Sequence, residues 1–309
     1  MTPNIIIDCD PGHDDAIAIM MAGQLTNILG ITTVSGNAPL SLTTENALIM
    51  TELLNLDAEV HAGASRPLMV APRHAEEAHG RSGLDGPDRP EISREVASND
   101  AVGFIIETIR TNDDIWLVPV GPLTNIALAV RQAPDIVDRV AGVSIMGGSA
   151  GAGNVTATAE FNVWADPHAA AIVFDAGFKK LLMAGLNLTH QFGIDEQLIA
   201  DLRALGNRAS LFAADLFDFY LASHRKRTHG QRAPLHDPCA VLAVTHPALF
   251  EFQSRSVRVE IDGAHTRGMT VVDERGWGEE PLNCEVEYGV DRDQGMKILL
   301  QTLSAYTEA

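Results

Sequence analysis

The sequence predicts an α/β fold, in which a mostly parallel central sheet is flanked by helices. Two observations lead to this prediction. Short apolar runs rich in β-branched residues alternate with segments of helical pattern up to about residue 187, which is typical of strand-helix-strand units. These runs are apolar throughout, as expected for strands that helices cover on both faces. The expected architecture is therefore an open, Rossmann-like sheet.

Each expected strand is bounded by Gly, Asn or Asp. The strand-like runs before residue 187 cover residues 4–8, 28–36, 114–121, 140–148 and 179–187. One helix is expected to begin near Asp14, and the others cover residues 40–55, 99–111, 123–132 and 166–177. The segment from 72 to 90 is rich in Gly, Pro and charge, so we expect a long loop of the kind that often carries function.

The pattern changes after about residue 187. Helices are expected at 194–206 and 208–224, alternating strands at 254–262, 268–274 and 284–290, and a last helix at 293–306. No Pro/Gly/Ser-rich linker separates the two parts. We therefore expect one domain over residues 1–309, with the C-terminal helices and strands as an appended layer.

The composition excludes several classes of partner. Lys and Arg total 22 against 41 Asp and Glu, a net charge of -19, which argues against nucleic acid or an anionic membrane and favours a metal cation or a neutral small molecule. The cysteines, Cys9, Cys239 and Cys284, are too few and too widely spaced for a disulfide framework or a CxxC site. With no signal-like N-terminus and no run long enough to span a bilayer, we expect a cytoplasmic protein.

Polar residues follow several of the expected strands. Open parallel sheets bind ligands outside the carboxyl ends of their strands, so these residues are candidates for a site. The candidates are Asp8, Asp10, Asn37, Val120, Thr124, Asn125 and Met146, followed by Asn154, Glu160 and Asn162 in the next stretch.

The first of these turns is unusually acidic. Pro11 and Gly12 break the strand, and Asp14 and Asp15 fall at the start of a helix, where acidic side chains could simply cap the helix. With Asp10 also within reach, three carboxylates would repel one another unless a cation neutralised them. Oxygen ligands without Cys or clustered His favour Ca²⁺ or Mg²⁺ over Zn²⁺. Asp14 and Asp15 point about 100° apart on a helix, so we expect one to hold metal and the other to reach a ligand.

Further candidates lie outside the first turn. Asp237 could be only an N-cap before Pro238, but together with the acidic turn it becomes a candidate metal ligand, with His236 as a candidate acid beside it. His79 lies in the long loop, where a lone histidine is usually a solvated surface residue. Cys9 points away from Asp8 and Asp10 and is expected to be a packed core thiol.

Seven blocks of the sequence resemble, in order and over nearly the whole chain, the signatures of the nucleoside hydrolases, in particular the inosine-uridine-preferring kind. They are DCDPGHDDAIAI, VSGN, HGRSGL, VPVGPLTNIALA, IMGGS, GNVTATAEFNVWADPHAA and PLHDP. The resemblance implies a Ca²⁺-dependent enzyme that hydrolyses the N-glycosidic bond of ribonucleosides to a free base and ribose. It also implies a homo-oligomer, a dimer or a tetramer.

The resemblance also assigns roles to residues. Calcium would be held by Asp10, Asp15, Asp237 and the carbonyl of Val120, with Asp10 also the base that takes a proton from a metal-bound water. His79 and His236 would be catalytic residues facing the nucleobase, and Asp8 would be a supporting residue. The substrate-binding set is Asp14, Asn37, Met146, Asn154, Glu160, Phe161, Asn162, Tyr220 and His224.

This chain departs from the family pattern in the base pocket. Where members often carry two aromatic residues one helical turn apart, it has Tyr220 and then His224. His224 could donate to the base, but its basic neighbours Arg225, Lys226 and Arg227 favour a solvated position. The departure leaves base preference open.

Two other functions share part of this pattern. A phosphotransferase of the haloacid-dehalogenase type also begins with a strand ending in DxD, but Pro11 and Gly12 replace the residues that follow in that family. A calcium-stabilised nucleoside-binding protein without turnover would fit the same residues. It is disfavoured because each catalytic position of the resembled family holds the expected residue type.

Overall fold

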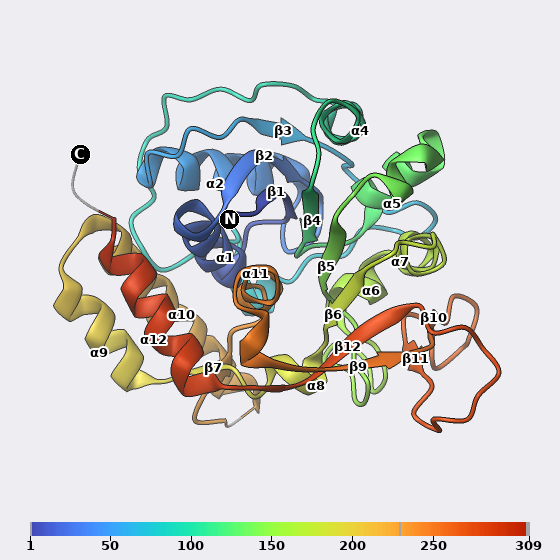
Figure 1. Ribbon diagram of the computed structural model, residues 1–309. Helices are drawn as coiled ribbons and strands as arrows, with labels where there is room; N and C mark the ends of the chain where they lie inside the picture. The colour runs from blue at the N-terminus through green and yellow to red at the C-terminus, as the bar shows by residue number, and fades with distance from the viewer. Residues whose placement is uncertain (1, 229, 307–309) are drawn as a thin grey trace.

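The central feature of the computed structural model, which describes residues 2–228 and 230–306, is an eight-stranded sheet. Its strand order is β3-β2-β1-β4-β5-β6-β12-β9, and every neighbouring pair is parallel except β12 and β9 (Figure 1). The bounds are β1 Asn4–Cys9, β2 Asn27–Thr33, β3 Val60–Ala62, β4 Ile115–Pro119, β5 Gly142–Met146, β6 Leu181–Ala184, β9 Phe250–Arg255 and β12 Cys284–Val290. The predicted α/β fold with a mostly parallel sheet is confirmed.

Helices cover both faces of this sheet (Figure 1). One face carries α1 His13–Leu25, α2 Leu40–Leu53, α10 Arg208–Thr228, α11 Pro238–Thr245 and α12 Arg292–Ser304, and the other carries α4 Ala101–Thr111, α5 Thr124–Gln132 and α7 Pro167–Phe174. Strand β1 shows the two layers directly, because Ile5 and Ile7 belong to one buried cluster and Ile6 to the other. This double burial is why the strands are apolar at every position.

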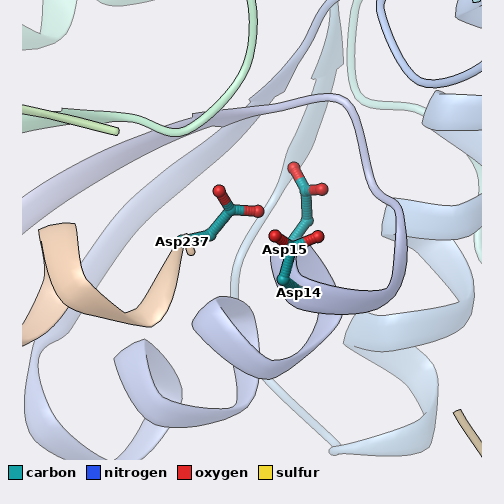
Figure 2. A group of neighbouring side chains, drawn as sticks. All are labelled: Asp14, Asp15 and Asp237. Atoms are coloured by element: carbon teal, nitrogen blue, oxygen red, sulfur yellow. The ribbon is translucent and has the colours of Figure 1, made fainter. Parts of the chain in front are cut away.

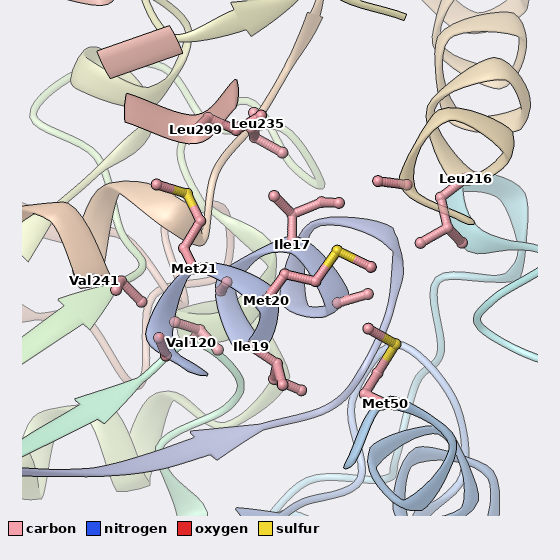
Figure 3. Packing of buried hydrophobic residues seen from close by; sticks show 14 of the residues in the cluster. Ile17, Ile19, Met20, Met21, Met50, Val120, Leu216, Leu235, Val241 and Leu299 are labelled. Atoms are coloured by element: carbon pink, nitrogen blue, oxygen red, sulfur yellow. The ribbon is translucent and has the colours of Figure 1, made fainter. Parts of the chain in front are cut away.

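Helix α1 is buried on all sides. Every residue from His13 to Ala22 is buried, and its side chains meet Met50 of α2, Leu216 of α10, Val241 of α11 and Leu299 of α12 (Figure 3). A helix surrounded by apolar partners has no polar face to turn towards water. The first turn of α1, which carries Asp14 and Asp15, is therefore held in place by the core.

The remaining elements are short or peripheral. They are α3 Glu76–His79, η1 Pro134–Asp138, α6 Phe161–Ala165, α8 Leu186–Thr189, β7 Gly193–Ile194, α9 Glu196–Leu205, β8 Ala233–Pro234, η2 Pro247–Leu249, β10 Val257–Val259 and β11 Thr270–Val272. Within the described ranges, no helix combines the length and apolar character needed to cross a bilayer. The three cysteines are buried and free, as expected.

The C-terminal strands differ in detail from the prediction. The expected strand at 254–262 is divided, because β9 ends at Arg255 and pairs with β12, whereas β10 pairs with β11 in a separate two-stranded sheet. β12 joins β6 and so extends the main sheet. The predicted loop at 72–90 contains one helical turn, α3, which ends at His79.

Candidate active site

A cavity of about 600 Å³ lies at the carboxyl ends of the central strands. Asn37 follows β2, Val120 follows β4 and Met146 ends β5, so neighbouring parallel strands deliver these residues to one edge of the sheet. The predicted residues that line the cavity are Asp14, Asn37, His79, Val120, Met146, Asn154, Glu160, Phe161, Asn162, Tyr220, His224, His236 and Asp237. The remaining candidates do not line it: Asp10 and Asp15 are fully buried, and Asp8, Thr124 and Asn125 are also buried.

Three aspartates converge at the cavity floor. Asp14 and Asp15 lie in the first turn of α1, and Asp237, immediately before α11, turns its carboxylate towards them (Figure 2). One carboxylate oxygen from each lies within 4.8 Å of the others. Such a spacing suits a single cation bound through oxygen.

Asp10 adjoins this group. Its backbone N–H donates to Oδ1 of Asp15 at 3.1 Å, and its own Oδ2 accepts from the backbone N–H of Asn37 at 2.6 Å. Its Oδ1 is buried and has no hydrogen-bond partner in the described part of the chain. The carboxylate is wedged between Gly36 and Gly121, where a Cβ would fall 2.0 Å and 2.4 Å from its oxygens. Asp10 is therefore fixed in place yet has one oxygen free.

The electrostatics of these four carboxyls favour a cation. Burial is the largest cause that raises the pKa of each, to about 8 for Asp14, and the charges of neighbouring aspartates raise the pKa of Asp10, Asp14 and Asp237 further. The backbone N–H groups of Gly12 and Asp10 lower the pKa of Asp15 in part. No lysine or arginine of the described chain forms an ion pair with any of the four. Buried carboxylate oxygens that have no positively charged side chain beside them fit the ligand set of a hard metal ion.

Asp8 has different surroundings. Its Oδ1 accepts from the hydroxyl of Thr32 at 2.6 Å and from Nδ2 of Asn125 at 2.8 Å, while Oδ2 is buried and has no partner among the described residues. Burial raises the pKa of Asp8 to about 7, and these two donors lower it. Neither Asp8 nor these two partners line the cavity, so Asp8 is set back from any ligand bound there.

One side of the cavity carries amides and a carboxylate. Glu160 accepts backbone N–H bonds from Asn162 at 2.8 Å, Gly148 at 2.9 Å and Val163 at 3.1 Å, which fix its carboxylate at the start of α6. Burial raises the pKa of Glu160 to about 7. Nδ2 of Asn162 donates to the carbonyl of Val120 at 2.8 Å and to that of Met146 at 3.1 Å. Such groups suit a ligand rich in hydroxyls.

The opposite side carries histidines and Tyr220. His224 is half-buried and lines the cavity, whereas its neighbours Arg225 and Lys226 are exposed. Helix α10 continues to Thr228 and brings Arg227 and Thr228 into the same wall. The charge of Arg227 contributes to lowering the pKa of His79, His224 and His236, although burial is the larger cause for each.

Two histidines in the site were not predicted. His190 lines the cavity, and its ring lies 5.9 Å from that of His236. His13 is fully buried behind His79, with its backbone N–H 3.2 Å and its Nδ1 3.1 Å from Nδ1 of His79. Its Nε2 lies 2.8 Å from the carbonyl of Asp85. The place of His13 between Gly12 and Asp14 was a usable signal, whereas nothing in the sequence marks His190.

Comparison with known proteins identifies similar chains. A sequence model described as inosine-uridine preferring nucleoside hydrolase matches residues 5–297. The pyrimidine-specific ribonucleoside hydrolase RihA of Shewanella sp. (strain ANA-3) is 42% identical over 313 residues, covering 99% of this chain and 98% of RihA.

Solved structures of the same kind are also similar to this chain. The purine-preferring ribonucleoside hydrolase from Gardnerella vaginalis has a TM-score of 0.92 and 31% identity, covering 98% of both chains. The plant nucleoside hydrolase PpNRh1 has a TM-score of 0.91 and 31% identity, covering 99% of this chain and all of its own, 100%.

Proposed function

The chain belongs to the family of inosine-uridine preferring nucleoside hydrolases and is a hydrolase acting on ribonucleosides, and from this premise we propose that it cleaves the N-glycosidic bond with a calcium ion held by its buried aspartates. The observation that carries the proposal is the set of buried carboxyls at the cavity floor, which have no positively charged partner in the described chain. The products would be ribose and a free base.

Asp10, Asp15, Asp237 and the carbonyl oxygen of Val120 are the proposed calcium ligands. Val120 already accepts one hydrogen bond from Asn162, which leaves the second lone pair of its carbonyl available. When bound, the ion would lower the pKa of a water molecule and orient it for attack. Asp14, which lines the cavity, would contact the ribose.

Asp10 is the proposed general base. Its Oδ2 is held by the backbone N–H of Asn37, while its Oδ1 has no protein partner in the described chain. A carboxylate fixed through one oxygen and free at the other can accept a proton from an attacking water without first reorienting. Asp10 would thus supply the proton acceptor that the reaction needs.

The two sides of the cavity would bind different parts of the substrate. Asn37, Asn154, Glu160 and Asn162 would meet the ribose hydroxyls, and the carboxylates around the sugar would stabilise the positive charge that develops as the bond breaks. His79 and His236 would face the base. The bond electrons pass to the base, the water oxygen joins C1′ of ribose, and the base gains a proton overall.

We further propose that pyrimidine ribonucleosides are the better substrates. The pyrimidine-specific RihA relative is more similar to this chain in sequence than the purine-preferring Gardnerella enzyme is. A homo-oligomeric assembly is also part of the proposal, and light scattering of the purified protein tests it.

The deciding experiment is a substrate panel. The purified protein is incubated with uridine, cytidine, inosine and adenosine, with calcium or with an excess of chelator, and free ribose is measured. We expect ribose release with calcium, faster from uridine or cytidine, and loss of activity with chelator that added calcium restores. No release from any substrate, together with nucleoside binding measured by calorimetry, would instead indicate a binding protein without turnover.

A further inference from the structure

The side chain of Thr189 makes an unexplained contact with a residue of the cavity wall. Thr189 ends α8 and is fully buried, and its Oγ1 lies 2.7 Å from Nδ1 of His236. His236 lies 47 positions later in the chain, so the contact joins two separate segments below the cavity. Thr189 itself does not line the cavity.

The direction of this hydrogen bond follows from what else Thr189 could bond. Other helical threonines donate to the carbonyl four residues earlier, as Thr245 does to Val241 at 3.0 Å and Thr302 to Ile298 at 2.7 Å. The Thr189 hydroxyl has no such bond, and Nδ1 of His236 is its one partner in the described ranges. Because buried hydroxyl protons are almost always bonded, the hydroxyl donates and Nδ1 accepts.

An accepting Nδ1 fixes where the ring carries its proton. A ring nitrogen that accepts a hydrogen bond carries no proton, so the ring is neutral and holds one N–H. That N–H is then on Nε2. Nε2 forms no hydrogen bond within the described part of the chain, and His236 lines the cavity.

We propose that Thr189 is a positioning residue, which holds His236 in the tautomer that presents its Nε2–H to the departing base. This inference rests on the proposed function. As the glycosidic bond breaks, its electron pair moves onto the base, so a donor fixed beforehand stabilises the transition state more than the bound substrate. The other tautomer would turn a lone pair towards an electron-rich base.

Thr189→Val and Thr189→Ser test the proposal. Valine removes the hydroxyl with little change in shape, serine keeps it, and Thr302→Val is a matched control that removes a helical threonine hydroxyl elsewhere. The rates are measured on uridine, whose base is a poor leaving group, and on p-nitrophenyl β-ribofuranoside, whose leaving group needs no donor.

We expect Thr189→Val to lower kcat on uridine by roughly 10²-fold with KM little changed, since a lost transition-state donor costs of this order. On the p-nitrophenyl riboside, the kcat of Thr189→Val should stay near that of the wild type. The kcat of Thr189→Ser and of Thr302→Val should stay near the wild-type value on both substrates. Equal losses on both substrates would assign Thr189 to packing alone. An unchanged kcat on uridine would overturn the proposal as well.

A spectroscopic arm separates this proposal from the proposed function. In wild-type protein with ¹⁵N-labelled histidine, NMR should show His236 with its proton on Nε2, and Thr189→Val should show a mixture of tautomers. A wild-type protein that releases no ribose would contradict the proposed function, while the NMR result would still decide the tautomer. An Nδ1-protonated His236 in the wild type would overturn the role of Thr189.

Discussion

Replacing Gly121 by alanine should displace the carboxylate of Asp10 and impair catalysis more than folding. Gly121 follows β4, and a Cβ built on it would fall 2.4 Å from Oδ1 of Asp10, 3.0 Å from its Cγ and 3.1 Å from its backbone nitrogen. The backbone of Gly121 lies outside the left-handed region, so alanine meets no conformational penalty there. The clash with Asp10 is therefore the main effect of the substitution.

The size of the effect follows from the distances. An ordinary contact between carbon and oxygen is about 3.3 Å, so the carboxylate oxygen would have to move by roughly 0.9 Å from its position 2.4 Å away. A displacement of about 1 Å in a catalytic group can cost roughly 10²-fold in rate. Overpacking of a buried site typically costs about 1–3 kcal/mol in the free energy of unfolding.

The assay compares ribose release and urea unfolding for the wild type, Gly121→Ala and Gly151→Ala. Gly151 is the control, because a Cβ there would find its nearest atom, the hydroxyl of Ser149, only at 3.9 Å. We expect the control to keep the wild-type rate. If folded Gly121→Ala turned over as fast as the wild type, the position of the Asp10 carboxylate would not limit the reaction, and the reasoning above would fail.

Three further predictions concern the buried carboxyls. Asp10→Ala should impair ribose release far more than it lowers the free energy of unfolding measured without calcium, whereas Asp8→Ala should do less damage to turnover; the reverse order of rates would contradict the assigned roles. Calcium at 100 times its dissociation constant should stabilise the wild type by about 2.7 kcal/mol, seen as a raised melting temperature that Asp237→Asn largely loses; an equal shift in both proteins would exclude Asp237 as a ligand. Glu287 is buried with both carboxylate oxygens unpartnered in the described chain, and burial raises its pKa well above 4.5. The carboxyl of Glu287 therefore holds its proton more tightly in the native state than in the unfolded chain. The free energy of unfolding falls as the pH rises above about 4.5. Glu287→Gln should be more stable than the wild type in urea at pH 8 and similar to it near pH 4; equal stability at pH 8 would refute this.

Much of the site could be predicted because parallel strands end at one edge of a sheet. Asn37, Val120 and Met146 are far apart in the sequence, but each follows or ends a strand of apolar pattern, and all of them line the cavity. Strand pattern and strand ends together therefore located the edge of the sheet that borders the cavity. The role of each residue follows from the resemblance to nucleoside hydrolases, and the variants at Asp8, Asp10 and Asp237 test it.

The other wall could not be predicted in the same way, because helices supply it. His190 follows the four-residue helix α8, and Arg227 lies in the last turn of α10, where a run of basic residues suggested a solvated helix end. Whether such a helix end faces water or a cavity depends on the packing of α10 against α1 and α3, which no local pattern encodes. The basic neighbours of His224 therefore gave no sign that it lines the cavity.

The contacts of Asp8 explain why β1 carries an aspartate near its end that does not face the cavity. Through Thr32 of β2 and Asn125 of α5, Asp8 links β1 to two neighbouring elements. Asn125 also donates to the carbonyl of Thr33 at 3.0 Å and accepts from the backbone N–H of Ala64 at 2.8 Å. Its side chain therefore bonds to the ends of β1 and β2 and to the segment that follows β3.

Asp10 lies two residues beyond Asp8, so its direction depends on how the end of β1 is held. The donors to Asp8 are a neutral hydroxyl and a neutral amide, which hold the carboxyl whether or not a cation is bound. The aspartates at the cavity floor instead face one another. Besides burial, the charges of neighbouring aspartates raise the pKa of Asp14 and Asp237, and a cation would relieve that repulsion. Loss of Asp8 should therefore loosen the position of Asp10 and lower kcat in part, and it should reduce the calcium-dependent rise in melting temperature less than loss of Asp237 does.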